Sequence, residues 1–205
     1  MYIPNTNLMS GKSEAVEFMQ RFNFATIISA KSDFPMATHL PFLVSFKDDI
    51  IILTSHFAKA NEHWKLIETD KILVIFSEPH AYISPKNYEK KLNVPTWNYI
   101  SVHAYGQGRI INDQENVLKV LENTINTFES EYMHQWDLLP HDYKDKMSKA
   151  IVAFEVRVTD LQAKKKLSQN KTEAERLNII DSLSKSANTN EHLIADYMKK
   201  DLSNI

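Results

Sequence analysis

The chain has 205 residues, no cysteine, and 24 Lys and Arg against 26 Asp and Glu, which gives a formal net charge of −2. A near-neutral chain has no broad positive field for a phosphate backbone, and without cysteine it has neither disulfides nor thiolate metal sites. The amino terminus lacks the basic and apolar regions of an export signal, and no run reaches the roughly 18 apolar residues of a membrane span. We therefore expect a cytoplasmic protein with no membrane partner.

The first half of the chain has the pattern of a short helix followed by β-strands. Apolar residues at helical spacing indicate the helix over residues 13–22. Residues 32–35 and 47–49 have the composition of turns, and helix formers around Trp64 indicate a helix over residues 58–67. Pro41 cannot donate to a sheet ladder, so its strand is expected to lie at an edge or to bend there. Strands are expected at residues 24–30, 36–46, 50–54 and 72–76.

The second half continues with strands and ends in helices. Residues 102–111 alternate loosely around two glycines, which indicates a bulge or a bend at a barrel corner. Asn112 and Glu115 resemble a capping box that opens a helix with an apolar stripe. A second helix is expected near residues 141–149 and a strand at residues 151–158. Two C-terminal helices are expected to begin at the pairs Thr172 with Glu175 and Asn188 with Glu191.

These elements predict a mainly β fold with helices, in the α+β class, with about six antiparallel strands and peripheral helices. The composition becomes polar and charged after Leu161, but helical signals continue to the end of the chain. We expect one main domain over residues 1–162 and a C-terminal helical appendage over residues 163–205.

Aromatic, amide, hydroxyl and imidazole groups are concentrated in three segments, His56–Asn61, His80–Pro85 and Val94–Tyr99. Aromatic rings offer flat apolar faces and polar tips need hydrogen-bond partners, so a planar molecule with a polar edge, such as a flavin, suits them. The ring and its edge would contact residues around Tyr82 and Trp97. An aromatic core with a turn at Pro95 would produce a similar pattern, so both interpretations stay open.

The end of the strand near Thr54 is a second candidate site. If a helix begins near Ala58, its free N–H groups and dipole favour a phosphate there. The sequence supplies hydroxyl, imidazole and ammonium groups from Thr54, Ser55, His56 and Lys59. An ordinary strand-to-helix turn, capped by Thr or Ser, is the alternative.

Other chemistries have less support. Histidines cluster between His39 and His103, but none has the spacing of an H-E-x-x-H site, so we predict no metal. The sequence contains neither a G-x-S-x-G elbow nor a glycine-rich phosphate loop. The basic cluster of Lys164–Lys166 and Lys171 is either a contact for a cofactor phosphate or DNA, or a solvated surface.

With these residues in view, the chain resembles the PaiB family, the FMN-binding negative transcriptional regulators of bacteria, which have a flavin-reductase-like split β-barrel. The likeness is nearly full length, and the motifs in the middle of the chain are specific to the family. Lys59 replaces the usual Arg, which keeps the charge and loses the bidentate fork. The motifs are Met1–Pro4, Ala37–Pro41, His56–Asn61 with Trp64, Pro79–Pro85 with Tyr88, Val94–Tyr99, Val102 with His103, Glu129, Ile151–Val152 with Phe154, and Lys166–Asn170.

The resemblance implies a homodimer with FMN as its cofactor, bound in a groove at the subunit interface. It implies that the C-terminal appendage packs on the barrel or on the dimer partner. Phosphate contacts would come from Ser55, His56, Lys59 and Asn61, and contacts to the ring and its edge from Thr38, Tyr82, Ser84, Trp97 and Asn98. His39 and Thr54 complete this set, and Lys166, Ser168 and Gln169 would close the site from the other subunit.

The function implied is negative transcriptional regulation. The alternative is an FMN-dependent oxidoreductase, similar to flavin reductases or pyridoxamine phosphate oxidases, in which the flavin supplies the redox chemistry. A flavin sensor or carrier without turnover is the third hypothesis. The sequence leaves open whether the protein is an enzyme, and its overall charge gives DNA binding no independent support.

Overall fold

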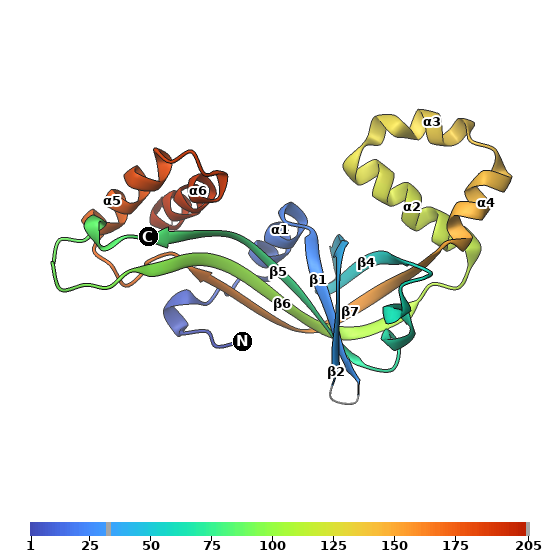
Figure 1. The fold of residues 1–205 in the computed structure, drawn as a ribbon, viewed down its shortest axis with the longest axis horizontal. Helices are drawn as coiled ribbons and strands as arrows, with labels where there is room; N and C mark the ends of the chain where they lie inside the picture. The colour runs from blue at the N-terminus through green and yellow to red at the C-terminus, as the bar shows by residue number, and fades with distance from the viewer. Residues whose placement is uncertain (32–33, 204–205) are drawn as a thin grey trace. The chain divides into compact units, whose positions relative to one another are not determined.

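The computed structural model describes residues 1–31 and 34–203, which form a seven-stranded antiparallel sheet with helices (Figure 1). This arrangement confirms the predicted α+β class. The strands are β1 (Phe24–Lys31), β2 (Phe34–Pro41), β3 (Leu43–Lys47), β4 (Ile50–Ala58), β5 (Lys71–Ile83), β6 (Thr96–Ile110) and β7 (Ile151–Lys166). The α-helices are α1 (Lys12–Arg21), α2 (Gln114–Phe128), α3 (Met133–Leu138), α4 (His141–Lys149), α5 (Glu173–Ser184) and α6 (Thr189–Ser203). The 3-10 helices are η1 (Asn5–Asn7), η2 (Glu62–Leu66), η3 (Pro85–Asn87) and η4 (Ser130–Tyr132).

The strand order is β2-β1-β5-β6-β7-β4-β3, so β2 and β3 are the edge strands. Pro41 ends β2 at this edge, as its missing N–H requires. The predicted single strand over residues 36–46 is divided at Phe42, whose buried side chain and N–H bond to the Asn23 carbonyl separate β2 from β3. Asp48 and Asp49, both at positive φ, form the two-residue turn between β3 and β4. Residues 32–33 of the first expected turn lie outside the described residues.

The helix predicted over residues 58–67 is wrong. β4 continues to Ala58 because its pairing with β7 extends to Ile151, and the Lys59 N–H donates to the Ala150 carbonyl at 2.8 Å. The chain becomes helical only at η2, where the Asn61 side chain accepts from the His63 N–H. The prediction failed because tertiary pairing outweighed a local run of helix formers.

The structure confirms one of the predicted helix caps and corrects another. Thr172 and Glu175 form both bonds of the predicted capping box at the start of α5. At α2, by contrast, Asp113 is the N-cap and accepts from the Asn116 N–H, so the predicted cap at Asn112 is wrong by one residue. Carboxylates and amides cap equally well, so this sequence does not distinguish the two.

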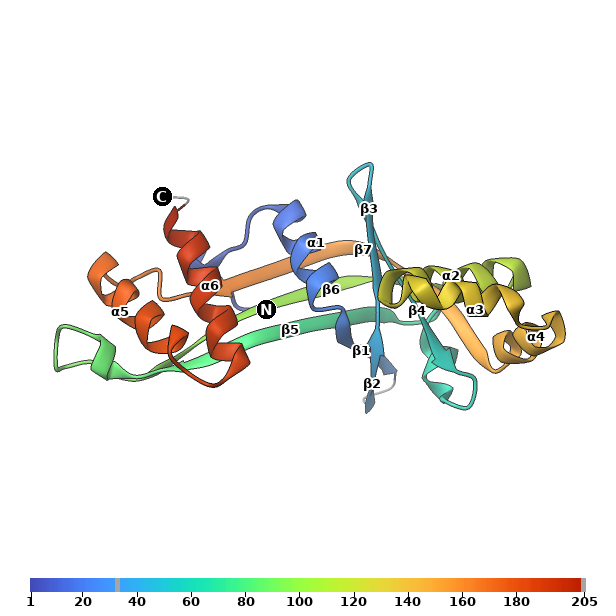
Figure 2. The ribbon, with the colours of Figure 1, turned by 90° about the horizontal axis from the view of Figure 1, so that it is seen from above.

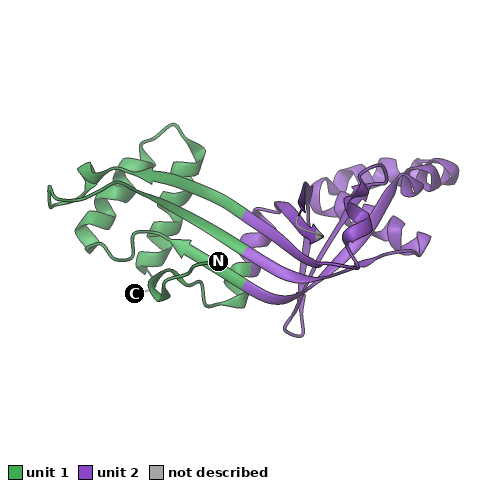
Figure 3. Ribbon diagram, turned by 60° about the horizontal axis from the view of Figure 1, so that its bottom comes forward, with its two compact units in different colours: residues 1–15, 77–102, 162–205 green, residues 16–76, 103–161 purple. Residues whose placement is uncertain are grey.

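The chain divides into two compact units, which Figure 3 colours separately. Unit 1 contains residues 1–15, 77–102 and 162–205, and unit 2 contains residues 16–76 and 103–161. The C-terminal helices therefore share their unit with the amino terminus and with parts of β5 and β6.

Unit 2 has an aromatic core under its strands. The rings of Phe57 and Phe154 stack at 4.7 Å, and Phe42 meets Phe76 and Phe154 edge-on at 6.0 and 6.1 Å. A second cluster forms where α2 packs on β7, with Val117, Val120 and Ala153 buried. These contacts fix β4, β7 and the residues that the strands carry.

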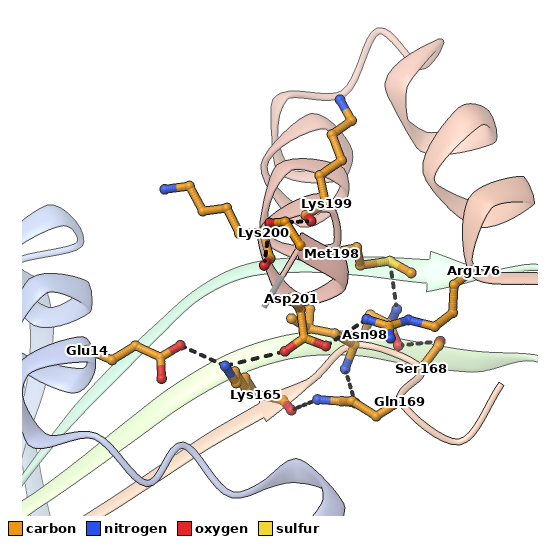
Figure 4. A network of polar contacts seen from close by, with 12 residues as sticks. Glu14, Asn98, Lys165, Ser168, Gln169, Arg176, Met198, Lys199, Lys200 and Asp201 are labelled. Atoms are coloured by element: carbon orange, nitrogen blue, oxygen red, sulfur yellow. Dashed lines mark hydrogen bonds and ion pairs between the residues drawn. The ribbon is translucent and has the colours of Figure 1, made fainter. Parts of the chain in front are cut away.

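In unit 1, α5 and α6 lie side by side over the ends of β5 and β6 (Figure 2). A chain of ion pairs joins these helices to the rest of the unit (Figure 4). Arg176 bonds to Asp201 at 2.6 Å, Asp201 contacts Lys165 at 3.3 Å, and Lys165 contacts Glu14 at 2.8 Å. The buried Arg176 needs this partner, because an unpaired buried charge is strongly destabilising.

Gly106 provides a test of how closely β6 packs on the neighbouring strand β7 within unit 2. A Cβ there would lie 2.3 Å from the backbone oxygen of Arg157, and backbone cannot rotate away. We expect Gly106→Ala to lower the free energy of unfolding by about 1–3 kcal/mol. Gly11→Ala is the matched control, because its nearest contact would be an ordinary 3.6 Å from Glu14 Cβ. Urea unfolding measures both variants, and a wild-type midpoint for Gly106→Ala would contradict the packing.

Candidate functional site

His63 is the centre of a buried polar network in unit 2. Its Nε2 lies 2.8 Å from Ser29 Oγ, and its Nδ1 lies 2.9 Å from Thr38 Oγ1. Asn61 Nδ2 donates to Thr38 Oγ1 at 3.2 Å, and Asn61 Oδ1 accepts from the His63 N–H at 3.1 Å. The structure thus brings together the predicted residues Thr38 and Asn61, through a histidine that the sequence analysis did not single out.

The His63 imidazole is fully buried beside the Phe57 ring, at 5.3 Å. Burial lowers the pKa of His63, which favours the neutral ring. A neutral imidazole has one donor and one acceptor nitrogen, and hydroxyl groups can complement either. His63 therefore fixes the side chains of Thr38 and Asn61. In the sequence, His63 is one of the histidines clustered between His39 and His103 and follows Asn61 by two residues, but neither feature indicates this role.

The predicted phosphate residues on β4 do not share one face. The side chains of Ile51, Leu53, Ser55 and Phe57 are buried, and those of Thr54 and His56 lie on the opposite face, as strand alternation requires. The Ser55 hydroxyl donates to the Pro41 carbonyl at 2.7 Å. On the other face, burial lowers the pKa of His56.

Lys59 and His39 occupy more open positions in unit 2. Lys59 is exposed and lines a pocket of about 300 Å³ together with Lys149 and Trp64. The Trp64 indole N–H donates to the Lys59 carbonyl at 3.1 Å, which fixes the chain at this point. His39 is exposed on the edge strand β2, where its ring stacks 6.5 Å from Phe24.

An aromatic platform lies on the sheet of unit 1, formed by His80 and Tyr82 from β5 and Trp97 from β6. The Trp97 ring lies 5.9 Å from Tyr82, edge to face, and 5.7 Å from His80. Tyr82 is 47% exposed and Trp97 51% exposed, so about half of each side chain is open to solvent. The structure therefore brings the two predicted residues Tyr82 and Trp97 together on one face of the sheet, where both are half exposed.

Asn98 lies on the opposite face from Trp97. It is fully buried, its Nδ2 donates to Met198 Sδ at 3.5 Å, and its Oδ1 accepts from the Ser168 hydroxyl at 3.0 Å (Figure 4). These contacts join β6 to α6 and to the turn after β7. Asn98 and Ser168 are thus brought together, but they satisfy each other within the unit.

The other predicted residues of unit 1 also have local partners. Ser84 caps η3 by accepting from the Lys86 N–H. Gln169 accepts from the Leu167 N–H and donates to the Lys165 carbonyl. Lys166, whose Nζ lies 2.5 Å from Thr96 Oγ1, lines a pocket of about 480 Å³.

Within residues 1–31 and 34–203, no group of three or more His, Asp or Glu side chains is placed to hold a metal ion. In the same ranges, none of the helices combines the length and the apolar character needed to cross a membrane.

Comparison with known proteins identifies the family. Residues 1–160 match a family described as "Putative FMN-binding domain". The chain is 36% identical over 205 residues to the Bacillus subtilis (strain 168) protein named "Protease synthase and sporulation protein PAI 2", with 98% of each chain covered. The chain belongs to the PaiB family. Its membership confirms the resemblance found in the sequence.

Solved structures support the fold of this PaiB-family protein. The FAD and heme binding protein from Mycobacterium smegmatis has a TM-score of 0.62 and 12% identity, with 83% of this chain and 78% of that chain covered. The flavocytochrome Anf3 from Azotobacter vinelandii has a TM-score of 0.58 and 18% identity, with 76% and 67% covered. The predicted split-barrel fold is confirmed.

The cofactor of this PaiB-family protein is a flavin, and the residues present fit one. In unit 1, exposed rings of Tyr82 and Trp97 offer faces for a tricyclic ring, and Lys166 lines a pocket of the same unit. In unit 2, Lys59 lines a pocket of its own. Tyr88 lines the same pocket as Lys166, and its buried hydroxyl has no hydrogen-bond partner among the described residues. A polar ligand would supply one.

His63 makes stability depend on pH in a testable way. Because burial lowers its pKa below 6.5, the unfolded chain binds a proton that the folded chain does not, and stability falls as the pH decreases through that value. We expect His63→Gln to lower stability at neutral pH by about 1–3 kcal/mol and to make the acid-side decline shallower. Some slope remains, since burial also lowers the pKa of His56 and His103.

Urea unfolding between about pH 7.5 and about pH 5 measures this slope. His134→Gln is the control, because His134 is exposed on α3. An equal slope for His63→Gln and the wild-type protein would show that His63 is not buried in its neutral form.

Proposed function

We propose that this PaiB-family protein is a flavin-binding negative transcriptional regulator that works as a cytoplasmic homodimer. The observation that carries the proposal is the alignment with a Bacillus subtilis protein over 98% of both chains, because that protein is named for protease synthesis and sporulation. The alignment also includes the C-terminal helices, which lie beyond the matched FMN-binding domain. A flavin-binding domain and a second, helical segment are thus retained together.

Within unit 1, the flavin ring is held on the aromatic platform. Tyr82 and Trp97 present large, half-exposed faces, and a flat heterocycle gains both apolar burial and ring contacts there. The flavin supplies redox chemistry when it is bound, and the protein supplies position and electrostatics. Because strands rather than loops carry Tyr82 and Trp97, their positions are set before a ligand arrives.

One observation favours an FMN-dependent oxidoreductase as the second candidate. The platform is exposed in the single chain, and an exposed flavin ring is accessible to a diffusing electron donor. A regulator requires only that the flavin bind and change an equilibrium. An enzyme additionally requires saturable turnover.

Two assays on the purified, flavin-loaded protein separate these functions. A regulator gives a sequence-dependent shift of DNA from the region upstream of its own gene, weakened by salt because phosphate contacts release counterions. An oxidoreductase oxidises NADH or NADPH faster than free FMN does, with saturation. Saturable turnover without any DNA shift would overturn the regulator, and a mass of one chain in light scattering would overturn the homodimer.

The platform itself is tested by Trp97→Leu, which removes the ring and keeps an apolar side chain. We expect affinity for FMN and riboflavin to fall equally, by roughly 10- to 100-fold, because stacking on an aromatic side chain is worth about 1–3 kcal/mol. Flavin fluorescence titration measures both affinities. Tyr143→Leu is the matched control, a half-exposed aromatic residue on α4 outside the platform. Unchanged affinities in Trp97→Leu would place the ring elsewhere.

A further inference from the structure

The pocket of about 480 Å³ in unit 1, here called the lysine pocket, holds two ammonium groups without a counter-ion. Its wall contains no carboxylate, and neither Lys166 nor Lys171 forms an ion pair with any described residue. The neighbouring Lys165, by contrast, contacts both Glu14 and Asp201. The side chains that matter here come from Tyr88, Asn93, Thr96, Lys166, Ser168 and Lys171.

Both ammonium groups have unused donors. Each carries three N–H groups. One from Lys166 reaches Thr96 Oγ1 at 2.5 Å, and one from Lys171 reaches Asn93 Oδ1 at 2.8 Å. Among the described residues, two N–H groups of each lysine therefore have no hydrogen-bond acceptor. Lys171 Nζ also lies 3.7 Å from the centre of the Tyr88 ring, which brings it into the pocket wall.

Tyr88 supplies an independent sign of a ligand. Its side chain is only 8% exposed, and its hydroxyl is shielded from water without a hydrogen-bond partner among the described residues. Burial raises the pKa of Tyr88, so the hydroxyl keeps its proton and is a donor at neutral pH. Buried polar groups are almost always paired, and an acceptor oxygen from a ligand would pair this one.

Hydrogen bonds within the turn after β7 fix the backbone next to Lys166 and Lys171. Ser168, at a positive φ of 59°, donates its hydroxyl to Asn98, and the Lys171 N–H donates to the Ser168 carbonyl at 3.0 Å. Gln169 uses both ends of its amide within the same turn. Ser168 and Gln169 are thus positioning residues, and the groups left for a ligand are those of the lysines.

We propose that the lysine pocket binds the phosphomonoester of FMN and so selects FMN over riboflavin. This inference rests on the proposed flavin binding in unit 1. A phosphomonoester is a dianion at neutral pH, which balances two ammonium charges, and its oxygens accept from the free N–H groups. Lys166 and Lys171 follow residue 160, where the match to the FMN-binding domain ends. The family resemblance gave Lys166 only a part in closing the site from the other subunit, and it gave Lys171 and the Tyr88 hydroxyl no contact with the flavin.

Lys59 is the alternative cation for binding the FMN phosphate. It shares its own pocket in unit 2 with Lys149, but that pocket is smaller and its wall includes Ile110, Val117 and Ile151. No buried polar group there is left without a partner among the described residues. The lysine pocket is therefore the better candidate for the phosphate site. Comparing FMN binding by variants of the two pockets tests this choice.

The experiment titrates the full-length protein, freed of flavin, with FMN and with riboflavin at fixed ionic strength, using flavin fluorescence. Wild-type protein is expected to prefer FMN by roughly tenfold or more, since hydrogen bonds to charged groups are the strong ones. The double variant Lys166→Gln, Lys171→Gln is expected to lose this preference and keep its riboflavin affinity. Retained riboflavin binding shows at the same time that the variant is folded.

Tyr88→Phe removes only the hydroxyl and is expected to weaken FMN binding by roughly three- to tenfold without affecting riboflavin. Tyr105→Phe and Lys90→Gln are the matched controls, a half-buried tyrosine of unit 2 and an exposed lysine of unit 1. Neither control is expected to change the preference for FMN. An effect of Tyr88→Phe on riboflavin equal to that on FMN would contradict a phosphate contact.

Other results of these titrations distinguish a wrong phosphate site from a wrong flavin assignment. If wild-type protein binds FMN and riboflavin equally, the phosphate pocket is wrong and flavin binding stands; if it binds neither, flavin binding itself fails. Loss of the preference in Lys59→Gln but not in the double variant would place the phosphate in unit 2. Phenyl phosphate is expected to compete with FMN and not with riboflavin, and its failure to compete would mean that the pocket does not hold the phosphate of FMN.

Discussion

The two-residue alternation of β5 and β6 determines what unit 1 can do. Ala81 and Ile83 face the helices that cover one side of the sheet, so Tyr82 must face the other side. In β6 the same rule buries Asn98 and leaves Trp97 half exposed. Because α5 and α6 cover the face that carries Ala81, Ile83 and Asn98, Tyr82 and Trp97 on the other face stay half exposed, and a binding platform results.

Alternation also gives neighbouring lysines of β7 different roles. Lys165 points to α6 and is neutralised by Asp201 and Glu14, so it belongs to the framework. Lys164 lies over the rings of Tyr2 and Tyr99. Lys166, one residue further, keeps its charge unpaired among the described residues, and burial lowers its pKa because desolvation penalises an ammonium.

The strand periods, the edge position of Pro41 and the cap at Thr172 were predictable, because each depends on residues close in the sequence. The role of His63 was not predictable, because its partners Ser29 and Thr38 lie on strands β1 and β2, far from it in the sequence. The pairing of Lys171 with Tyr88 likewise exists only in the folded chain. The alternation of side chains along a strand would have improved the prediction of the site. Adjacent residues such as Trp97 and Asn98 point to opposite faces of a strand, so they cannot both contact one flavin ring.

The positions of the clustered lysines in the fold affect how a regulator of this kind would contact DNA. In the sequence, Lys164–Lys166 with Lys171 is the one basic cluster, yet in the fold Lys164 is buried, Lys165 is paired and the other two line a pocket. None of them is left as a free basic surface, and the net charge of −2 offers no general attraction to phosphates. A regulator with this fold would therefore contact DNA through side chains outside this cluster, and the positive charge inside the pocket suits a small anion.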